Sequence, residues 1–194
     1  PDHNVGFWPE TAACIRLLIC CGQRVRETLR LEGKHIDLTE RVWRMPADLS
    51  KTGKKTGKGH VIPLPKQAVE VLQPLIDQYG DSPLFPSRYG AKGVLLDDQS
   101  VMQAISRWTE REGVKCEAFQ TRDIRRTWKS RTHDAGIDRF YRDMIQQHSK
   151  SDIGTVAYDR AEYLPQMREA MAKWEAWLDR ITGEPAPVIH LAAA

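Results

Sequence analysis

The sequence predicts an α+β fold that is mainly α-helical and contains one small antiparallel β-sheet. Over several long segments, among them 66–79 and 164–181, apolar residues recur every three or four positions, which is the period of an amphipathic helix. Two short apolar segments, 42–46 and 60–64, flank a stretch rich in glycine and lysine, which is typical of a β-hairpin. A chain of 194 residues can bury one substantial core, so we expect one main domain.

Six helices are expected, in chain order, at residues 9–22, 66–79, 98–112, 122–135, 138–147 and 164–181. The first begins at Pro9, because proline suits the first position of a helix, and it stops at Gly22. The second ends before Gly80. The last has an apolar stripe that includes Met167 and Trp174, and we expect this stripe to pack on the core.

The small sheet is expected from two strands at 42–46 and 60–64. Between them, residues 51–59 are rich in glycine and lysine, and this composition predicts a hairpin turn.

Five charged or reactive side chains occur in an order that suits cleavage of a phosphodiester by a tyrosine: Arg24, Lys51, Arg125, His148 and Tyr158. A phosphodiester under attack spreads charge over its two non-bridging oxygens, which the planar guanidinium groups of Arg24 and Arg125 can clamp. Tyr158 is the candidate nucleophile. Its phenol has an ordinary pKa of about 10, so neighbouring cations must favour the phenolate.

The other two side chains suit proton transfer and hydrogen bonding. Lys51 is the candidate acid for the departing sugar oxygen, since surrounding cations lower the pKa of a lysine. His148 can donate a hydrogen bond to the same phosphate or help to move a proton, because its ordinary pKa lies near neutrality. No step in this scheme requires a metal ion or another cofactor.

Three motifs in chain order carry a resemblance to a known family: Gly22-x-Arg24-x-x-Glu27, then Arg122-x-x-Arg125-Arg126-Thr127, then Gln147-His148 with Tyr158 ten residues further on. Over roughly residues 10–180 the sequence resembles the tyrosine recombinases, or phage-type integrases. The segment AYDRAEYL at 157–164 is similar to the nucleophile segment of prophage-type integrases.

The resemblance implies the family's catalytic-domain fold, a helical core with a small sheet, and places the five side chains named above in the catalytic site. Glu27 would orient the two arginines through hydrogen bonds. Most members carry histidine where this chain has Arg122, which can hold the phosphate but hardly acts as a base. The spacing from His148 to Tyr158 is one residue longer than is usual in the family, and Tyr163 remains an alternative nucleophile.

The family's lysine lies on a hairpin like the one expected here, and alignment through the preceding strand favours Lys51 for that role. Lys54, Lys55 and Lys58 are rivals for it. At the tip of a hairpin, these lysines are also expected to contact DNA phosphates in a groove, as is Arg126.

By resemblance, the function is site-specific recombination of DNA through a 3′-phosphotyrosyl intermediate, for integration and excision of a prophage or another mobile element. The implied partners are double-stranded attachment sites, a homo-oligomer that forms a tetramer on DNA, and accessory DNA-bending proteins. The energy of the broken bond stays in the intermediate, so no nucleotide cofactor is expected. Two alternatives stay open: a DNA-binding module with impaired catalysis, and a tyrosine-type DNA topoisomerase.

Residues 1–182 are expected to form the catalytic domain, and residues 183–194 a C-terminal tail that begins with a linker rich in proline. The apolar end of this tail is expected either to be disordered or packed on itself, or to be exchanged between protomers as similar tails are in the family. Members of the family usually carry DNA-binding domains ahead of the catalytic one, and we expect this chain to lack them.

The net charge of +3 and the pI of about 8.7 are modest for a DNA-binding protein, but cations cluster at 51–58 and 122–131. The four cysteines lack metal-ligand spacing and are expected to be reduced core residues: Cys14, Cys20, Cys21 and Cys116. No apolar run approaches the roughly 20 residues that span a bilayer, and no signal peptide opens the chain. We therefore expect a cytoplasmic protein without membrane association.

Overall fold

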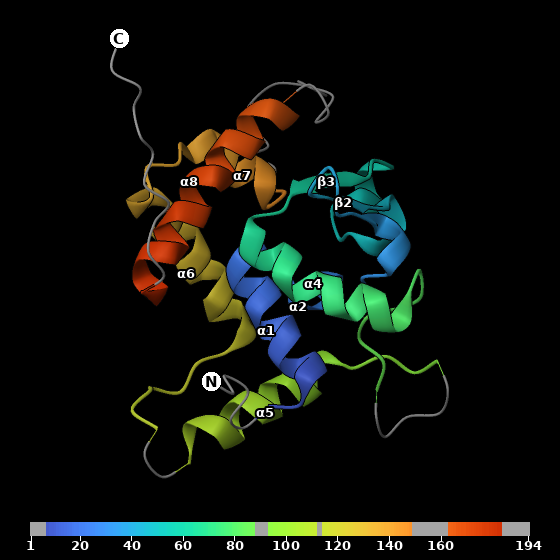
Figure 1. Cartoon of the computed structure of the whole chain (residues 1–194), viewed down its shortest axis with the longest axis vertical. Helices are drawn as coiled ribbons and strands as arrows, with labels where there is room; N and C mark the ends of the chain where they lie inside the picture. Colours follow the sequence, from blue (N-terminus) through green and yellow to red (C-terminus); the bar gives the residue numbers. More distant parts are fainter. Residues whose placement is uncertain (1–6, 88–92, 112–113, 149–162, 184–194) are drawn as a thin grey trace.

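Helix α1 (Pro9–Cys21) runs through the middle of the molecule and contacts α4, α5 and α6 (Figure 1). The computed structural model describes residues 7–87, 93–111, 114–148 and 163–183. The longer helices after α1 are α4 (Lys66–Tyr79), α5 (Asp98–Thr109), α6 (Thr121–Asp134), α7 (Arg139–Ile145) and α8 (Leu164–Thr182). A three-stranded antiparallel sheet completes the core, so the predicted fold class, mainly helical with one small sheet, is confirmed.

Helix α1 has the predicted ends. Pro9 occupies its first turn, and Gly22 caps it with a left-handed φ of 62° and an N–H that donates to the Leu18 carbonyl. A Cβ added to Gly22 would lie 2.4 Å from the Trp128 ring. Position 22 therefore needs glycine both for its backbone conformation and for the close approach of α6.

The other long helices lie close to their predicted ranges. Helix α4 matches its prediction, and α6 and α8 differ from theirs by one residue at one end or at both. Helix α5 ends at Thr109, ahead of the predicted 112. On α8, buried Met167, Met171 and Trp174 form the predicted apolar stripe, and Trp174 packs edge-on against Trp128 with ring centroids 6.0 Å apart.

Helix α7 is shorter than predicted at both ends. Asp138 stands outside the helix as its N-cap, and its carboxylate accepts a hydrogen bond of 2.7 Å from the Phe140 N–H. At the other end, Gln147 adopts a left-handed φ of 51°, which the helix cannot accommodate. The chain therefore leaves α7 after Ile145 and turns toward His148.

The sheet has three strands in the order β1 (Ile36–Asp37), β2 (Val42–Met45) and β3 (His60–Pro63). Both pairs are antiparallel, and Trp43 of β2 lies between Ile36 and Ile62 in the register. The predicted pairing of β2 with β3 is confirmed. Strand β1 was not predicted, because two residues are too few to show a period.

The connection between β2 and β3 is more regular than the predicted hairpin turn at 51–59. It contains a 3-10 turn, η2 (Ala47–Leu49), and a single turn of α-helix, α3 (Gly53–Thr56). A Cβ added to Gly53 would lie 2.5 Å from the carbonyl oxygen of Ala47, so the connection is folded tightly on itself. Hydrogen bonds of 3.0 Å from the Lys54 N–H to the Ser50 carbonyl and of 3.1 Å from Gly53 to the Ser50 hydroxyl stabilise it.

Three cysteines belong to the core and the fourth does not. Cys14, Cys20 and Cys21 on α1 are free and buried, as predicted, and burial raises the pKa of the Cys14 and Cys20 thiols to about 12. Cys116 is exposed, so the core prediction is wrong for this residue, which lies in the irregular segment ahead of α6. None of the helices in the described part of the chain is both long and apolar enough to cross a membrane.

Candidate active site

The first part of the site is built on the turn that follows α1. Arg24 stands as the N-cap of a short helix, α2 (Val25–Thr28), and its Nη1 donates to the buried carboxylate of Glu27 at 3.1 Å. The same carboxylate accepts a hydrogen bond of 3.0 Å from the Lys51 N–H. Glu27 therefore ties Arg24 to the connection that carries Lys51, which supports its predicted orienting role.

The second part comes from α6, on which Arg122, Arg125 and Lys129 follow one face at spacings of three and four. The guanidinium of Arg125 donates to the Gly22 carbonyl at 2.6 Å and to the Gln146 carbonyl at 2.5 Å. Burial, followed by the nearby charge of Arg24, lowers the pKa of Arg125 to about 10, so the group stays cationic at neutral pH.

His148 lies against Arg125 and Lys129. Its Nε2 is 3.1 Å from the Arg125 Nη2, and its Nδ1 is 3.0 Å from the Lys129 Nζ. Burial, followed by the positive charges of Arg125 and Lys129, lowers the pKa of His148 to about 4. The imidazole is therefore neutral at physiological pH.

Hydrogen bonds dock the β2–β3 connection onto the turn that carries His148. The Ser50 hydroxyl donates to the side-chain oxygen of Gln147, and the Thr52 hydroxyl donates to the Gln147 carbonyl at 3.5 Å. On β3, the His60 ring contacts the Ile145 carbonyl at 2.9 Å. These contacts bring Lys51 and His148, which are far apart in the sequence, to the same place.

The result is an open, cationic pocket of about 370 Å³ lined by Arg24, Lys51, Thr52, Lys55, Thr56, Gln147 and His148. Three of the predicted catalytic side chains line it, and Arg125 joins them through its contact with His148. A pocket with several cations and hydrogen-bond donors can bind a phosphate group. Within the described residues, no cluster of three or more His, Cys, Asp or Glu side chains could hold a metal ion.

The remaining predicted side chains are placed as follows. Arg122 is exposed in the first turn of α6, and its side chain makes no hydrogen bond or ion pair with other described residues. Arg126 is exposed and lies 3.5 Å from the carboxylate of Asp123. Lys54 and Lys58 are exposed on the β2–β3 connection, away from the pocket lining, whereas Lys55 belongs to that lining.

The two candidate nucleophiles are Tyr158 and Tyr163. Tyr158 lies outside the described residues. Tyr163 is the N-cap of α8, and its ring packs edge-on against Phe140 of α7 with centroids 5.6 Å apart. Tyr163 therefore has a packing role at the junction of α7 and α8.

Several contacts of the site were not predicted from the sequence. Lys129 and Asp143 bond each other beside His148 at 2.6 Å, and Ser50 and Gln147 join the two halves of the site. The spacing of Lys129 from Arg125 by one helical turn was a signal that both lie on one face. No sequence signal identified the contacts of the other three, because their partners are distant in the chain.

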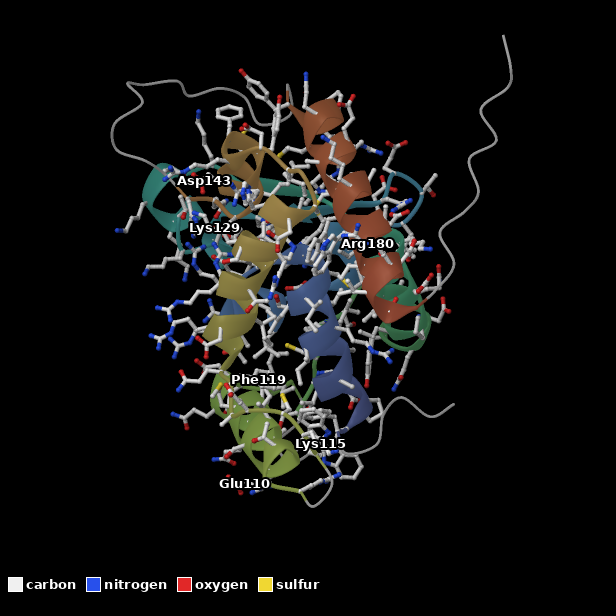
Figure 2. All side chains as sticks on the ribbon, turned by 90° about the vertical axis from the view of Figure 1, so that its left-hand side faces the viewer. Glu110, Lys115, Phe119, Lys129, Asp143 and Arg180 are labelled. Atoms are coloured by element: carbon white, nitrogen blue, oxygen red, sulfur yellow. The ribbon has the colours of Figure 1, made fainter. Side chains whose placement is uncertain are left out.

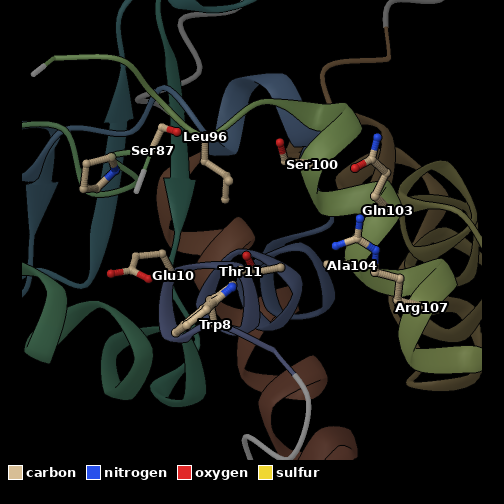
Figure 3. A pocket seen from close by; sticks show the side chains of 10 residues that line it. Trp8, Glu10, Thr11, Ser87, Leu96, Ser100, Gln103, Ala104 and Arg107 are labelled. Atoms are coloured by element: carbon tan, nitrogen blue, oxygen red, sulfur yellow. The ribbon is translucent and has the colours of Figure 1, made fainter. Parts of the chain in front are cut away.

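A separate pocket of about 320 Å³ lies between the start of α1 and α5 (Figure 3). Trp8, Glu10, Ser100 and Arg107 are among its lining side chains. None of the predicted catalytic residues belongs to it, so the cationic pocket remains the candidate active site.

Comparison with solved structures shows that the fold is that of a tyrosine recombinase catalytic domain. The integrase from mycobacterium phage Brujita aligns with a TM-score of 0.62 and 22% identity, over 86% of this chain and 52% of that one. XerA recombinase aligns with a TM-score of 0.59 and 19% identity, over 73% and 50%. The Tn1549 transposon integrase in complex with transposon right end DNA aligns with a TM-score of 0.55 and 18% identity, over 78% and 57%.

The chain belongs to the phage integrase family, which residues 9–163 match. It is similar to prophage integrase IntZ of Escherichia coli (strain K12), with 31% identity over 171 residues. That alignment covers 86% of this chain but 39% of IntZ, so the chain spans about two fifths of the length of this relative.

Proposed function

We propose that this chain is the catalytic part of a site-specific DNA recombinase that integrates and excises a prophage or another mobile element. The observation that carries the proposal is the convergence of Arg24, Lys51 and His148 on one pocket, with Arg125 in contact with His148. Two guanidinium groups, an ammonium group and a neutral imidazole match what cleavage of a phosphodiester needs. Membership of the phage integrase family supports the same conclusion.

In the proposed reaction, the oxygen of Tyr158 attacks the scissile phosphorus while Arg24 and Arg125 clamp the two non-bridging oxygens. Tyr158 releases its phenolic proton to solvent as it attacks. The bond from phosphorus to the 5′-oxygen breaks, and Lys51 protonates that oxygen. A 3′-phosphotyrosyl bond replaces the broken ester bond. The released 5′-hydroxyl of another strand then attacks the phosphorus. A new bond from phosphorus to the 5′-oxygen forms, the bond to the tyrosyl oxygen breaks, and Tyr158 leaves and regains its proton, so rejoining needs no nucleotide cofactor.

DNA is the proposed partner of the exposed cations beside the pocket. Lys54, Lys55 and Lys58 on the β2–β3 connection and Arg126 on α6 would contact backbone phosphates. Arg122, one helical turn before Arg126, would hold the scissile phosphate in place of the family's histidine. The complex of the Tn1549 integrase with transposon right end DNA supports DNA as the ligand of this fold.

The assembly on DNA is proposed to be a homo-tetramer on attachment sites, with accessory DNA-bending proteins. Residues 1–182 form the catalytic domain in this proposal. Recombination by this assembly depends on the covalent protein–DNA intermediate, so the test of the proposed function looks for that intermediate first.

The tail at 183–194 is proposed to be exchanged between protomers. An apolar pocket of about 320 Å³ between α1, α6 and α8 supports this, with Ile19, Phe119, Trp177 and Ile181 in its lining. Removal of the tail is expected to shift the chain toward the monomer in sedimentation velocity experiments at matched concentrations. Identical sedimentation of the full and truncated chains would contradict the exchange.

The test of the proposed function is covalent capture. The 194-residue chain is incubated with nicked duplexes that carry candidate attachment sites, and a protein–DNA band is sought under denaturing conditions. We expect the band with the native chain and with Tyr163→Phe, and we expect its loss with Tyr158→Phe. Tyr163→Phe is the matched control, because the same hydroxyl is removed five residues away.

Other outcomes would overturn parts of the proposal. A band that is lost only in Tyr163→Phe would move the nucleophile to Tyr163. DNA binding by the native chain without a covalent band would favour a catalytically impaired DNA-binding module. Relaxation of supercoiled plasmid by the chain alone, without recombinant products, would favour a topoisomerase.

A further inference from the structure

Lys129 of α6 and Asp143 of α7 form an ion pair where the two helices meet (Figure 2). The Lys129 ammonium donates to the Asp143 carboxylate at 2.6 Å, and the two side chains are 34% and 15% exposed. The same ammonium lies 3.0 Å from the His148 Nδ1. The backbone carbonyl of Asp143 also accepts a hydrogen bond of 2.8 Å from the backbone N–H of His148, so the imidazole is held close to both residues.

The hydrogen bonds around the His148 ring constrain its proton. A neutral imidazole has one N–H donor and one lone pair that accepts. Both ring nitrogens face cations that can only donate, namely the Lys129 ammonium at Nδ1 and the Arg125 guanidinium at Nε2. One nitrogen must therefore accept, and the N–H on the other must point toward a cation.

The surroundings decide which nitrogen accepts. Asp143 holds Lys129 in place, and the closest Asp143 oxygen is 3.6 Å from Nδ1, too far to accept an N–H there. At Nε2, an N–H would face the Arg125 Nη2 at 3.1 Å, and an anion bound beside that guanidinium could accept from both groups. The tautomer with an accepting Nδ1 and a donating Nε2 is therefore the one in which a bound phosphate can accept the imidazole N–H.

We propose that Lys129 is a positioning residue: it donates to the His148 Nδ1, keeps the imidazole proton on Nε2, and so points a neutral donor at the scissile phosphate. Asp143 holds Lys129 for this task. Only the catalytic consequence rests on the proposed function, since the tautomer is a property of the protein without DNA.

The charges that face His148 come from several elements. Arg125 and Lys129 approach from α6, Asp143 from α7, and Arg24 from the turn after α1, while Arg139 lies 3.7 Å from the Asp143 carboxylate. Among them the cations predominate, and together with burial they hold the imidazole neutral. His148 can then donate from Nε2 at neutral pH without itself titrating.

The direct test is ¹⁵N NMR of the histidine side chains in the 194-residue chain. In the native protein we expect His148 to show a protonated Nε2 and an unprotonated Nδ1. In Lys129→Met, which keeps the aliphatic stem but removes the donor, we expect the proton to move toward Nδ1 because Arg125 remains the only donor. We also expect the pKa of His148 to rise, since one of the cations that lowers it is gone.

Two further variants keep this test clear. Lys173→Met is the matched control, because the Lys173 ammonium instead donates to the Gly136 carbonyl at 3.3 Å and should leave the His148 signals unchanged. Lys129→Arg retains a cationic donor and should restore the native tautomer. The native spectrum alone overturns the proposal if it shows the proton on Nδ1, and so does an unchanged His148 spectrum in folded Lys129→Met.

The catalytic consequence has its own measurement. Covalent cleavage by Lys129→Met is expected to fall about 10-fold or more, which corresponds to the loss of one hydrogen bond to a charged group. Its pH profile should gain a limb at low pH as His148 begins to titrate, and Lys129→Arg should recover most of the rate. If the native chain gives no covalent product, the proposed function fails, and the tautomer is tested by NMR alone. An unchanged pH profile in an active Lys129→Met would overturn the catalytic consequence.

Discussion

The guanidinium of Arg125 donates a hydrogen bond of 2.6 Å to the carbonyl oxygen of Gly22, and this contact joins α6 to the end of α1. Gly22 has a left-handed backbone that ends α1, and the side-chain amide of Gln146 donates to the same carbonyl at 3.1 Å. The end of α1 thus serves as a fixed support for one of the two clamp arginines. Packing at Gly22 and geometry at the active site are therefore linked.

Gly22→Ala is predicted to destabilise the protein by on the order of 2–5 kcal/mol. The left-handed backbone alone costs an alanine about 1–2 kcal/mol, and overpacking against Trp128 adds about 1–3 kcal/mol. Urea unfolding measures the loss. Gly57→Ala is the matched control, because Gly57 also has a left-handed φ of 68° but has no atom within 4 Å of its added Cβ. An equal loss in both variants would show that the contact with Trp128 is unimportant.

Arg125→Lys is predicted to reduce covalent cleavage by about 100-fold or more, because an ammonium cannot reach two carbonyls and a phosphate as the planar guanidinium does. Affinity for DNA should change little, since backbone phosphates are contacted by many other cations. Cleavage at saturating DNA and fluorescence anisotropy of the complex separate the two effects. Arg131→Lys on the same helix, where Arg131 pairs with Asp134 at 3.0 Å, should behave like the native chain.

Glu27 is predicted to act through the residues that it binds. In Glu27→Ala the partly buried Lys51 N–H and the Arg24 guanidinium lose their acceptor, which should cost about 1–3 kcal/mol of unfolding free energy. Glu27→Gln keeps an oxygen acceptor and should cost less, while cleavage still falls because the charge that orients Arg24 is gone. Denaturant unfolding and covalent cleavage are measured on both variants. Equal stability losses for the two substitutions would argue against the hydrogen-bonding role.

Local signals explain why most helices could be predicted. Pro9 and Gly22 set the ends of α1, and Gly80 follows the last residue of α4. Each of these residues acts through its own backbone preferences, so the helix end that it sets can be predicted from the local sequence. The end of α7 has no such signal. Glutamine rarely adopts a positive φ, and Gln147 is held in this conformation by contacts with Ser50 and Thr52.

The candidate site also contains features that the sequence predicted and features that it did not. The motifs predicted Arg24, Arg125 and His148 as site residues because their residue types and order suit one chemistry. They could not predict the short helix after Lys51 or the contact of Lys129 with Asp143, since both depend on how distant segments pack. A turn rich in glycine and lysine is compatible with many backbones, and here tertiary hydrogen bonds select one.

The lowered pKa of His148 predicts how stability depends on pH. The imidazole takes up a proton at a pH near 6.5 in the unfolded chain but only near 4 in the folded one. Between these values the unfolded state binds more protons, so the free energy of unfolding falls as the pH falls from about 6.5 to about 4, and His148 contributes no further loss below that.

His148→Gln should remove this contribution and flatten the dependence of stability on pH within that window. Because the side chain is 36% exposed, solvent screening makes the difference smaller than the full pKa shift would give. His35, whose pKa burial also lowers, adds a loss of the same sign, so the informative quantity is the difference between the native chain and His148→Gln. Urea unfolding at pH 7, 5.5 and 4.5 supplies it, and parallel curves for the two proteins would mean that His148 has an ordinary pKa in the folded chain.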